Sequence, residues 1–386
     1  MTSTHFAASS STRRRPAQWR HTHRIAAGPN SPLRGGNRTR RSAAENKQEV
    51  GMLRHRVPMA ALRTGPLRRT TALATACAAV CATVIVTAVT GTGTAGAAAP
   101  CPGGAAPARL VGTVPGAALE GLTVDSRGRL YTTDLVSGRV FRLDRPGAGA
   151  VPIAKVPSGG AGALAWTPDG TLLVGYGSDP RVFLGDAIRP GAIARLDVNN
   201  LALRPWVGGL SAADGMDVSA RGNVYATNDF GNLVGRITPA GAVQANWASI
   251  PSANGAVLNR DDSFLYVSRT FSNPGVSRIS TGNPRIVQSL LTLGGADALA
   301  APDGLTLDAA DRPVVPFNAG GQIVRITSPG RYCVLASGLP LSSVVSYGRS
   351  ASGFSAGHLY RAGFDGRIYE IPSGYSAGSV AAFPGR

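Results

Sequence analysis

The fold is decided by one stretch of the chain, Leu119-Glu120-Gly121-Leu122-Thr123-Val124-Asp125-Ser126-Arg127-Gly128-Arg129-Leu130-Tyr131-Thr132-Thr133-Asp134. It contains an acidic residue before a glycine, a short alternating strand, a polar turn, and a second strand that ends in a polar residue. The pattern recurs at Ala213-Asp214-Gly215, Ala253-Asn254-Gly255 and Pro302-Asp303-Gly304, with a weaker copy at Ala161-Gly162. Such a repeat predicts fold and site together, because equivalent positions in sequence become equivalent positions in space.

The repeat has the period of a propeller blade. The strand-opening glycines are spaced by 41, 53, 40 and 49 residues, at Gly121, Gly162, Gly215, Gly255 and Gly304. Each unit ends in a similar strand, as at residues 138–144 and 191–197, and a sixth, blurred unit follows at residues 341–371. Four-stranded blades repeat at about this period. We therefore predict an all-β fold, a six-bladed β-propeller, over residues 101–386. A β-sandwich is the alternative, but it would not repeat one motif at this spacing.

The formal charge of +18 is concentrated at the start of the chain. Residues 1–70 carry 15 Lys and Arg against Glu45 and Glu49, whereas the chain from Cys101 carries 24 Lys and Arg against 19 acidic residues. No basic stripe interleaved with aromatic residues follows, so we expect no nucleic-acid binding by the later region. We interpret residues 1–58 as a disordered basic leader. It is either a nucleic-acid-binding arm or, as we favour, a segment that is not native because translation starts at Met59 or Met52.

Residues 59–99 have the three regions of a secretory signal peptide. Arg63, Arg68 and Arg69 form the positive region, residues 72–89 form an apolar run, and residues 97–99 offer a small-residue cleavage site. A retained membrane anchor is the alternative, but the run is rich in Ala and Thr, so its insertion energy is modest. We expect a secreted protein that keeps no stable membrane span after cleavage.

Signal cleavage leaves two cysteines, Cys101 and Cys333. An even pair in an oxidising compartment favours a disulfide over two free buried thiols. We expect the bridge to tie the start of the mature chain to the last blade.

The mature region is poor in the residues that many catalytic sites need. It contains one His (His358), one Lys (Lys155) and two Glu (Glu120 and Glu370). A Ser-His-Asp or Cys-His triad would depend on His358 alone, and His and Cys are too few for a zinc site. Any metal must therefore be held mainly by oxygen.

The residues before the strand-opening glycines are the strongest site candidates. The innermost strand of each blade lines the central channel of a propeller, so these residues form a ring at one mouth. In chain order they are Glu120, Ala161, Asp214, Asn254 and Asp303. Carboxylates gathered without a nearby Lys or His repel one another unless a cation is bound. This oxygen set suits Ca²⁺, with Mg²⁺ or Mn²⁺ as alternatives. The competing interpretation is that Asp-Gly and Asn-Gly simply form turns, which fits Asp169-Gly170.

A second ring is formed by the polar residues that close the second strands, Asp134, Asn228 and Asn318. Hydrogen bonding to the next blade is the interpretation that we favour for this ring, and substrate binding is the alternative. Asn228 and Arg269 are our candidates for substrate contact. Arg269 either orients an anionic substrate or is a solvated residue at the rim.

Three phrases of the sequence resemble the senescence-marker-protein/gluconolactonase family of six-bladed propellers, over about residues 108–372: Leu119-Glu120-Gly121, Ser252-Ala253-Asn254-Gly255 and Ala301-Pro302-Asp303-Gly304-Leu305. That superfamily also includes calcium-dependent phosphotriesterases, and many family members hydrolyse sugar lactones. The resemblance implies that Glu120, Asn254 and Asp303 are ligands of a divalent cation. The family pattern has Asn-Asp-Gly in the middle blade and Pro after the first Glu-Gly, whereas this chain has Ala213-Asp214-Gly215 and Leu122.

We therefore expect a secreted, monomeric, metal-dependent hydrolase whose small-molecule substrate is a lactone or another small ester. In such an enzyme the cation polarises the carbonyl and lowers the pKa of a water molecule, and Asp303 or Asp214 accepts the proton. The alternative is a non-catalytic extracellular propeller with a structural channel ion, whose loops bind a ligand or partner. Ala213 favours that alternative, because the sugar-recognising side chain of the family is missing.

Overall fold

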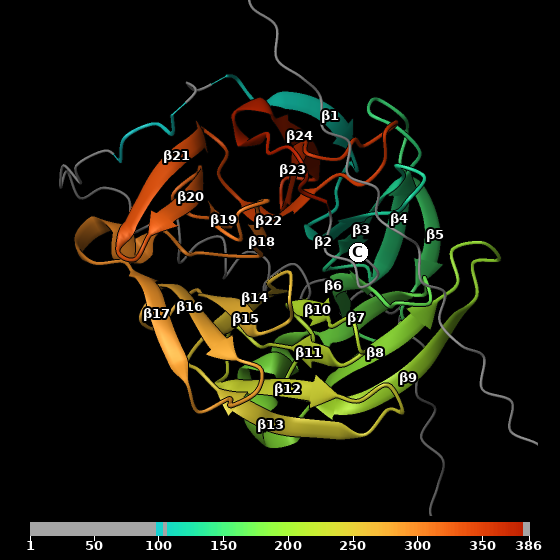
Figure 1. Ribbon diagram of the computed structural model, residues 1–386. Helices are drawn as coiled ribbons and strands as arrows, with labels where there is room; N and C mark the ends of the chain where they lie inside the picture. The colour runs from blue at the N-terminus through green and yellow to red at the C-terminus, as the bar shows by residue number, and fades with distance from the viewer. Residues whose placement is uncertain (1–97, 103–105, 381–386) are drawn as a thin grey trace, which may run out of the picture. The chain divides into compact units, whose positions relative to one another are not determined.

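The structure is a computed structural model that describes residues 98–102 and 106–380. This part of the chain forms six four-stranded antiparallel sheets. The prediction of a six-bladed β-propeller is confirmed, and Figure 1 shows the six sheets arranged around a common centre. The leader predicted at residues 1–58 and all but the last two residues of the signal peptide predicted at 59–99 lie outside the described residues. Across the described ranges, no helix is long and apolar enough to cross a membrane.

Blades one to three are built from consecutive strands, with the innermost strand first in each. Blade one contains β2 (Leu119–Val124), β3 (Leu130–Asp134), β4 (Arg139–Leu143) and β5 (Val151–Lys155). Blade two contains β6 (Gly160–Trp166), β7 (Leu172–Ser178), β8 (Gly191–Leu196) and β9 (Leu203–Leu210). Blade three contains β10 (Met216–Val218), β11 (Val224–Ala226), β12 (Leu233–Ile237) and β13 (Val243–Ser249).

Blades four and five repeat this order, and blade six combines the two ends of the described chain. Blade four contains β14 (Ala253–Leu258), β15 (Phe264–Arg269), β16 (Gly275–Ser280) and β17 (Val287–Thr292). Blade five contains β18 (Thr306–Leu307), β19 (Pro313–Phe317), β20 (Gln322–Ser328) and β21 (Arg331–Ser337). Blade six contains β22 (Ser342–Tyr347), β23 (Leu359–Gly363), β24 (Arg367–Ile371) and β1 (Arg109–Thr113).

The strands that we expected to end each unit, such as residues 138–144, are the third strands of their blades. A fourth, outermost strand follows each of them in blades one to five. These outer strands are half solvated: β5 buries only its central Ile153, whereas every residue of β2 is buried. Edge strands with an irregular apolar pattern give a weak sequence signal, which is why they were missed.

The ring is closed by the pairing of the first strand with the last. β1 runs antiparallel to β24, with Arg109 opposite Glu370 and Thr113 opposite Arg367. This pairing makes both ends of the domain depend on each other, because neither end has another sheet to join.

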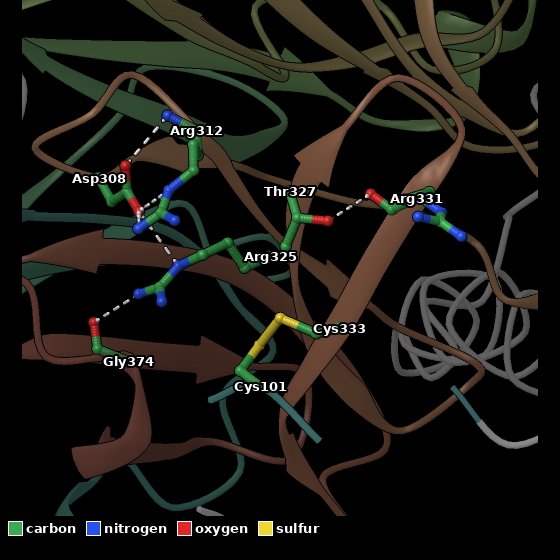
Figure 2. Close-up of a disulfide and its surroundings, with 8 residues drawn as sticks. All are labelled: Cys101, Asp308, Arg312, Arg325, Thr327, Arg331, Cys333 and Gly374. Carbon is green, nitrogen blue, oxygen red and sulfur yellow. Dashed lines mark hydrogen bonds and ion pairs between the residues drawn. A yellow bond between two sulfur atoms is a disulfide. The ribbon is translucent and has the colours of Figure 1, made fainter. Parts of the chain in front are cut away.

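The disulfide Cys101–Cys333 is present, as Figure 2 shows, with the two Cα atoms 4.8 Å apart. The pairing was predicted correctly, but the blade was not. Cys333 lies in β21, the outer strand of blade five, where the Cys101 amide also donates to the Val334 carbonyl at 2.9 Å. The bridge therefore fastens the segment before β1 across the boundary between blades five and six.

Apolar side chains hold the blades together face to face. Six clusters of buried apolar residues each draw on two neighbouring blades. Between blades one and two, for example, Tyr131 and Trp166 meet edge to face with ring centroids 5.6 Å apart. Burial of this surface is the main force that stabilises the ring.

The strand-opening glycines let the innermost strands approach each other closely. A Cβ at Gly121 would lie 2.6 Å from the Gly162 carbonyl oxygen, and one at Gly304 would lie 2.8 Å from the Ser343 carbonyl oxygen. The Ser343 hydroxyl donates to the Leu119 carbonyl at 2.5 Å, which completes the inner ring. Any side chain at these glycines would push neighbouring blades apart.

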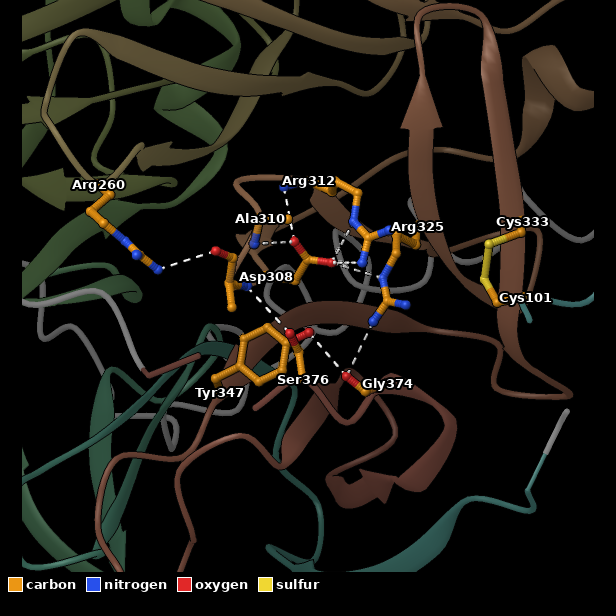
Figure 3. A network of polar contacts seen from close by, with 11 residues as sticks. Cys101, Arg260, Asp308, Ala310, Arg312, Arg325, Cys333, Tyr347, Gly374 and Ser376 are labelled. Carbon is orange, nitrogen blue, oxygen red and sulfur yellow. Dashed lines mark hydrogen bonds and ion pairs between the residues drawn. A yellow bond between two sulfur atoms is a disulfide. The ribbon is translucent and has the colours of Figure 1, made fainter. Parts of the chain in front are cut away.

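A buried polar network joins blades five and six (Figure 3). Asp308 forms ion pairs with Arg312 Nη2 at 2.8 Å and with Arg325 Nε at 3.1 Å. The Gly374 carbonyl accepts from Tyr347 Oη at 3.0 Å and from Arg325 Nη2 at 3.4 Å. Asp308 follows β18 whereas Asp303 precedes it, so the two carboxylates lie at opposite ends of this strand. The paired charges of this network give it a structural role.

The long interval of 53 residues in the repeat comes from an insert in blade two, residues 179–190. It contains η1 (Pro180–Leu184) and α2 (Gly185–Ile188). Two further short helical segments are η2 (Gly295–Leu299), before blade five, and η3 (Pro372–Gly374), after β24.

Candidate functional site

The predicted ring residues lie at the start of the inner strands. Glu120 and Asn254 are the second residues of β2 and β14, while Asp214 lies two residues before β10 and Asp303 three residues before β18. Inner strands of a propeller run in the same direction along the axis, so these starts share one mouth. Glu120, Asp214 and Asn254 also line one cavity between the inner strands.

Asp303 is the centre of the polar cluster. Its Oδ1 accepts from Asn254 Nδ2 at 2.8 Å and from its neighbour's amide, Gly304 N, at 2.9 Å. Its Oδ2 accepts from Asn318 Nδ2 at 2.8 Å. Asn254 Nδ2 also reaches Thr270 Oγ1 at 3.0 Å. These contacts join blades four and five and fix the orientation of the carboxylate.

Three side-chain oxygens around this cluster are buried and have no hydrogen-bond partner among the described residues. They are Glu120 Oε2, Asn254 Oδ1 and Asn318 Oδ1. A buried polar atom without a partner costs about 1–3 kcal/mol. Three such oxygens, together with carboxylates, make a donor set that fits a hard divalent cation.

Carboxylates alone do not form the candidate site. Within the described residues, no group of three or more His, Cys, Asp or Glu side chains is arranged to hold a metal ion. A cation at this mouth would therefore need the amide oxygens of Asn254 and Asn318 in addition to Glu120 and Asp303.

The electrostatics of the mouth favour protonated carboxylates when no cation is bound. Burial raises the pKa of Glu120 well above its ordinary value, and three neighbouring carboxylates raise it further. Burial also raises the pKa of Asp303 to about 8, with a contribution from Asp214. The pKa of Asp214 is raised by burial to about 6. Asp214 is partly exposed, unlike Glu120 and Asp303. Solvent therefore weakens the electrostatic interactions of Asp214 with the other carboxylates.

Sequence reasoning missed one member of this cluster, Asp229. Burial, and then repulsion from Asp214 and Asp303, raise its pKa well above the ordinary value. Asp229 follows Asn228, the residue that the repeat aligns, so its place one position after this aligned residue was the available signal. Asn318, which we expected to bond to the next blade, accepts at its carbonyl from Leu341 N at 3.0 Å, just before blade six, while its side chain contacts Asp303 within its own blade.

The two residues predicted to contact substrate form hydrogen bonds away from the carboxylates. Asn228 Nδ2 donates to the Val182 carbonyl at 3.0 Å and to Ser211 Oγ at 2.8 Å, so it anchors the blade-two insert. Arg269 Nη2 donates to the Leu291 carbonyl at 2.8 Å, because the opposite residue, Gly275, has no side chain to block the path toward β17. A role in substrate contact remains a prediction for both, and our proposals do not depend on it.

The one histidine among the described residues, His358, does not join the mouth. His358 Nδ1 lies 2.6 Å from Glu370 Oε1, in blade six. Asp134, the first residue of the predicted second ring, accepts from Ala118 N at 3.0 Å and Val136 N at 3.1 Å. It therefore stabilises the turn after β3.

We predict that, in chelator, the free energy of unfolding falls as the pH rises from about 4 to about 8. The unfolded carboxylates have pKa values near 4, whereas those of Asp214 and Asp303 are raised to about 6 and about 8. The folded state thus holds more protons, and this stabilisation is complete below pH 4 and lost as the pH rises through the folded pKa values. The expected loss is on the order of a few kcal/mol.

Urea denaturation at several pH values measures this loss. Asp303→Asn should flatten the pH dependence, because the amide does not titrate. Asp169→Asn is the matched control, since the pKa of Asp169 is lowered by its bond from Thr167 in a hairpin turn. An unfolding free energy with the same pH dependence in wild type and Asp303→Asn would contradict the prediction.

Comparison with known proteins identifies solved structures that have a similar fold. No protein-family model and no curated protein matches the sequence. The structure is similar to a gluconolactonase from Xanthomonas campestris, with 17% identity, a TM-score of 0.56, and coverage of 73% of this chain and 99% of that one. It is also similar to the calcium-binding protein regucalcin from Agrobacterium tumefaciens, with 14% identity, a TM-score of 0.57, and coverage of 72% and 97%.

These two neighbours are six-bladed propellers of the gluconolactonase and regucalcin type, and the resemblance predicted from the sequence is confirmed at the level of the fold. A PQQ-bound aldose sugar dehydrogenase from Streptomyces coelicolor is similar too, with 16% identity, a TM-score of 0.50, and coverage of 68% and 96%. Neighbours with such different names show why activity must be argued from the site itself.

Proposed function

We propose that this chain is a secreted, divalent-cation-dependent hydrolase that acts on a lactone or another small ester. The observation that carries the proposal is the set of three unpartnered buried oxygens beside Asp303, from Glu120, Asn254 and Asn318. Such a set has a cost in the folded protein unless a ligand satisfies it. The gluconolactonase and regucalcin neighbours support the same class of site.

The cation would be held by Glu120, Asn254 and Asp303, with Asn318 as a fourth oxygen donor. Ca²⁺ is the first candidate, because it accepts mixed carboxylate and amide oxygens in flexible geometry. When bound, such an ion supplies a Lewis acid that polarises a carbonyl oxygen.

The proton acceptor that we favour is Asp214. Both oxygens of Asp303 already accept amide hydrogen bonds, whereas Asp214 is partly exposed at the mouth and its pKa of about 6 suits a base near neutral pH. In ester cleavage, the oxygen of a water molecule bonds to the carbonyl carbon as Asp214 takes a proton. The acyl C–O bond then breaks, and the proton passes to the leaving alkoxide.

A second function is favoured by one observation. Ala213 is fully buried, and its carbonyl accepts from Ala163 N at 3.3 Å. The backbone of Ala213 thus joins blades two and three. Its methyl group has no donor or acceptor that could bind a sugar hydroxyl. A non-catalytic propeller with a structural ion is the corresponding candidate.

Export is part of the proposal. A disulfide is typical of oxidising compartments, and the Cys101–Cys333 bridge supports the prediction of a signal peptide. N-terminal sequencing of the secreted protein should begin between Ala98 and Cys101. Recovery of the protein in membranes with residues 72–89 retained would contradict it.

Elemental analysis followed by a lactone and ester panel tests the hydrolase. We expect one bound divalent cation per chain and turnover that chelator removes and added Ca²⁺ restores. Cation binding without turnover of any lactone or ester would favour the non-catalytic propeller. Turnover that is unaffected by chelator would contradict the proposed site.

A further inference from the structure

Three phenylalanines form a row of contacting rings at the protein surface, which we call the aromatic shelf (Phe183, Phe230 and Phe271). The Phe183 and Phe230 ring centroids are 4.3 Å apart, and those of Phe230 and Phe271 are 5.1 Å apart with nearly parallel planes. Phe183 and Phe271 are 53% and 55% exposed. Contiguous exposed apolar surface of this kind marks a binding site more often than chance exposure does.

Two residues of the shelf are sequence neighbours of residues in the carboxylate cluster at the channel mouth or in contact with it. Phe230 follows Asp229, a member of the carboxylate cluster, and Phe271 follows Thr270, whose hydroxyl accepts from Asn254 Nδ2 at 3.0 Å. The Ser252 hydroxyl connects both places. It donates to the Asp229 carbonyl at 2.8 Å and accepts from the Phe271 amide at 2.8 Å.

The shelf is held in place by polar contacts. Phe183 belongs to the blade-two insert. Asn228 Nδ2 holds that insert in place by donating a hydrogen bond to the Val182 carbonyl. Asp186 of the insert accepts from Ser211 Oγ and from Asn232 N, each at 2.7 Å. A rigid support keeps the rings exposed instead of letting them fold onto the core, so a ligand meets a preformed surface.

The insert adds further apolar surface. Leu184 and Ile188 are 64% and 52% exposed. These side chains extend the exposed apolar surface of the insert that carries Phe183.

We propose that the aromatic shelf binds an aryl or acyl group of the substrate, so that the enzyme prefers apolar-substituted lactones or esters over polyhydroxylated ones. This inference rests on the proposed function, because it places the reactive carbonyl at the carboxylate mouth. A small ligand fits better than a second copy of the chain. Stable protein interfaces bury about 800 Å² on each partner, whereas an aromatic side chain contributes at most about 150–250 Å², and these three are only partly exposed.

The test compares two lactones of the same ring size, one with a phenyl substituent and one without. Wild type should prefer the phenyl lactone in kcat/KM. That preference should fall about 10-fold in Phe271→Ala and in Phe183→Ala, because each removes part of the apolar contact. Tyr375→Ala is the matched control, since it removes an exposed ring that contacts His358 in blade six. It should leave the preference as it is in wild type.

Binding of the phenyl lactam, which resists hydrolysis, separates this inference from the proposed hydrolysis. If the lactam binds and the two Phe variants weaken it about 10-fold while no lactone or ester is turned over, the hydrolase fails and the shelf stands. If lactones are hydrolysed without a phenyl preference, the shelf inference is overturned and the hydrolase stands. Self-association of the wild type that Phe271→Ala abolishes would also overturn it, in favour of an interface between copies.

Discussion

Replacing Asp303 with Ala is expected to lower cation affinity by about 100-fold or more and to abolish cation-dependent hydrolysis. The substitution removes a charged ligand and, with it, the acceptor that orients the Asn254 and Asn318 amides. The melting temperature should fall in the presence of Ca²⁺, since stabilisation by a ligand vanishes when binding does. In chelator the difference from wild type should be smaller, because only the loss of the hydrogen bonds from Asn254 and Asn318 remains.

Asp169→Ala is the control for this experiment. Its carboxylate accepts from Thr167 Oγ1 and Thr171 N in the turn between β6 and β7. The substitution removes one acidic residue next to a glycine, as in Asp303→Ala, but leaves the mouth intact. Equal cation affinity in Asp303→Ala and wild type would contradict the assigned ligand set.

Loss of the disulfide is expected to produce the largest change in stability. The bridge closes a loop of 232 residues, for which the chain-entropy model gives about 5 kcal/mol. In the double variant Cys101→Ser, Cys333→Ser, the melting temperature should therefore fall by roughly 10 °C. Thermal unfolding of the variant, compared with wild type before and after reduction, measures the effect.

The result for the reduced wild type is the internal control. It should unfold like the double variant, because both lack the covalent link but keep the pairing of β1 with β24. A melting temperature that is the same in all three samples would show that the closure of the ring by β1 is sufficient on its own.

The repeat allowed most of the fold to be predicted. Gly121, Gly215 and Gly304 mark inner strands whose close approach only glycine permits, so their spacing contained the number of blades. The outer strands were less visible, because one face of each meets solvent and residues such as Pro205 in β9 interrupt the pattern. Cys333 lies in β21, the outer strand of blade five, and this strand was not recognised in the sequence.

Only those site residues that occupy equivalent positions in the repeat could be predicted from the sequence. Glu120, Asn254 and Asp303 occupy equivalent positions in the repeat, and the structure places all of them at or just before the starts of inner strands. Asp229 lies one residue beyond Asn228, the position that the repeat aligns. It belongs to the turn that follows β11. The direction of Arg269 depends on the absence of a side chain at Gly275, on the neighbouring strand. Such cross-strand effects are set by register, which sequence patterns specify weakly.

The central claim is that one divalent cation replaces protons in the carboxylate cluster. It is tested most directly by calorimetric titration of Ca²⁺ into chelator-treated protein near pH 7, in two buffers of different ionisation enthalpy. The account predicts one site per chain and the release of protons on binding, because the pKa of Asp303 is raised to about 8 before the cation binds. A titration with no binding, or binding without proton release, would contradict it.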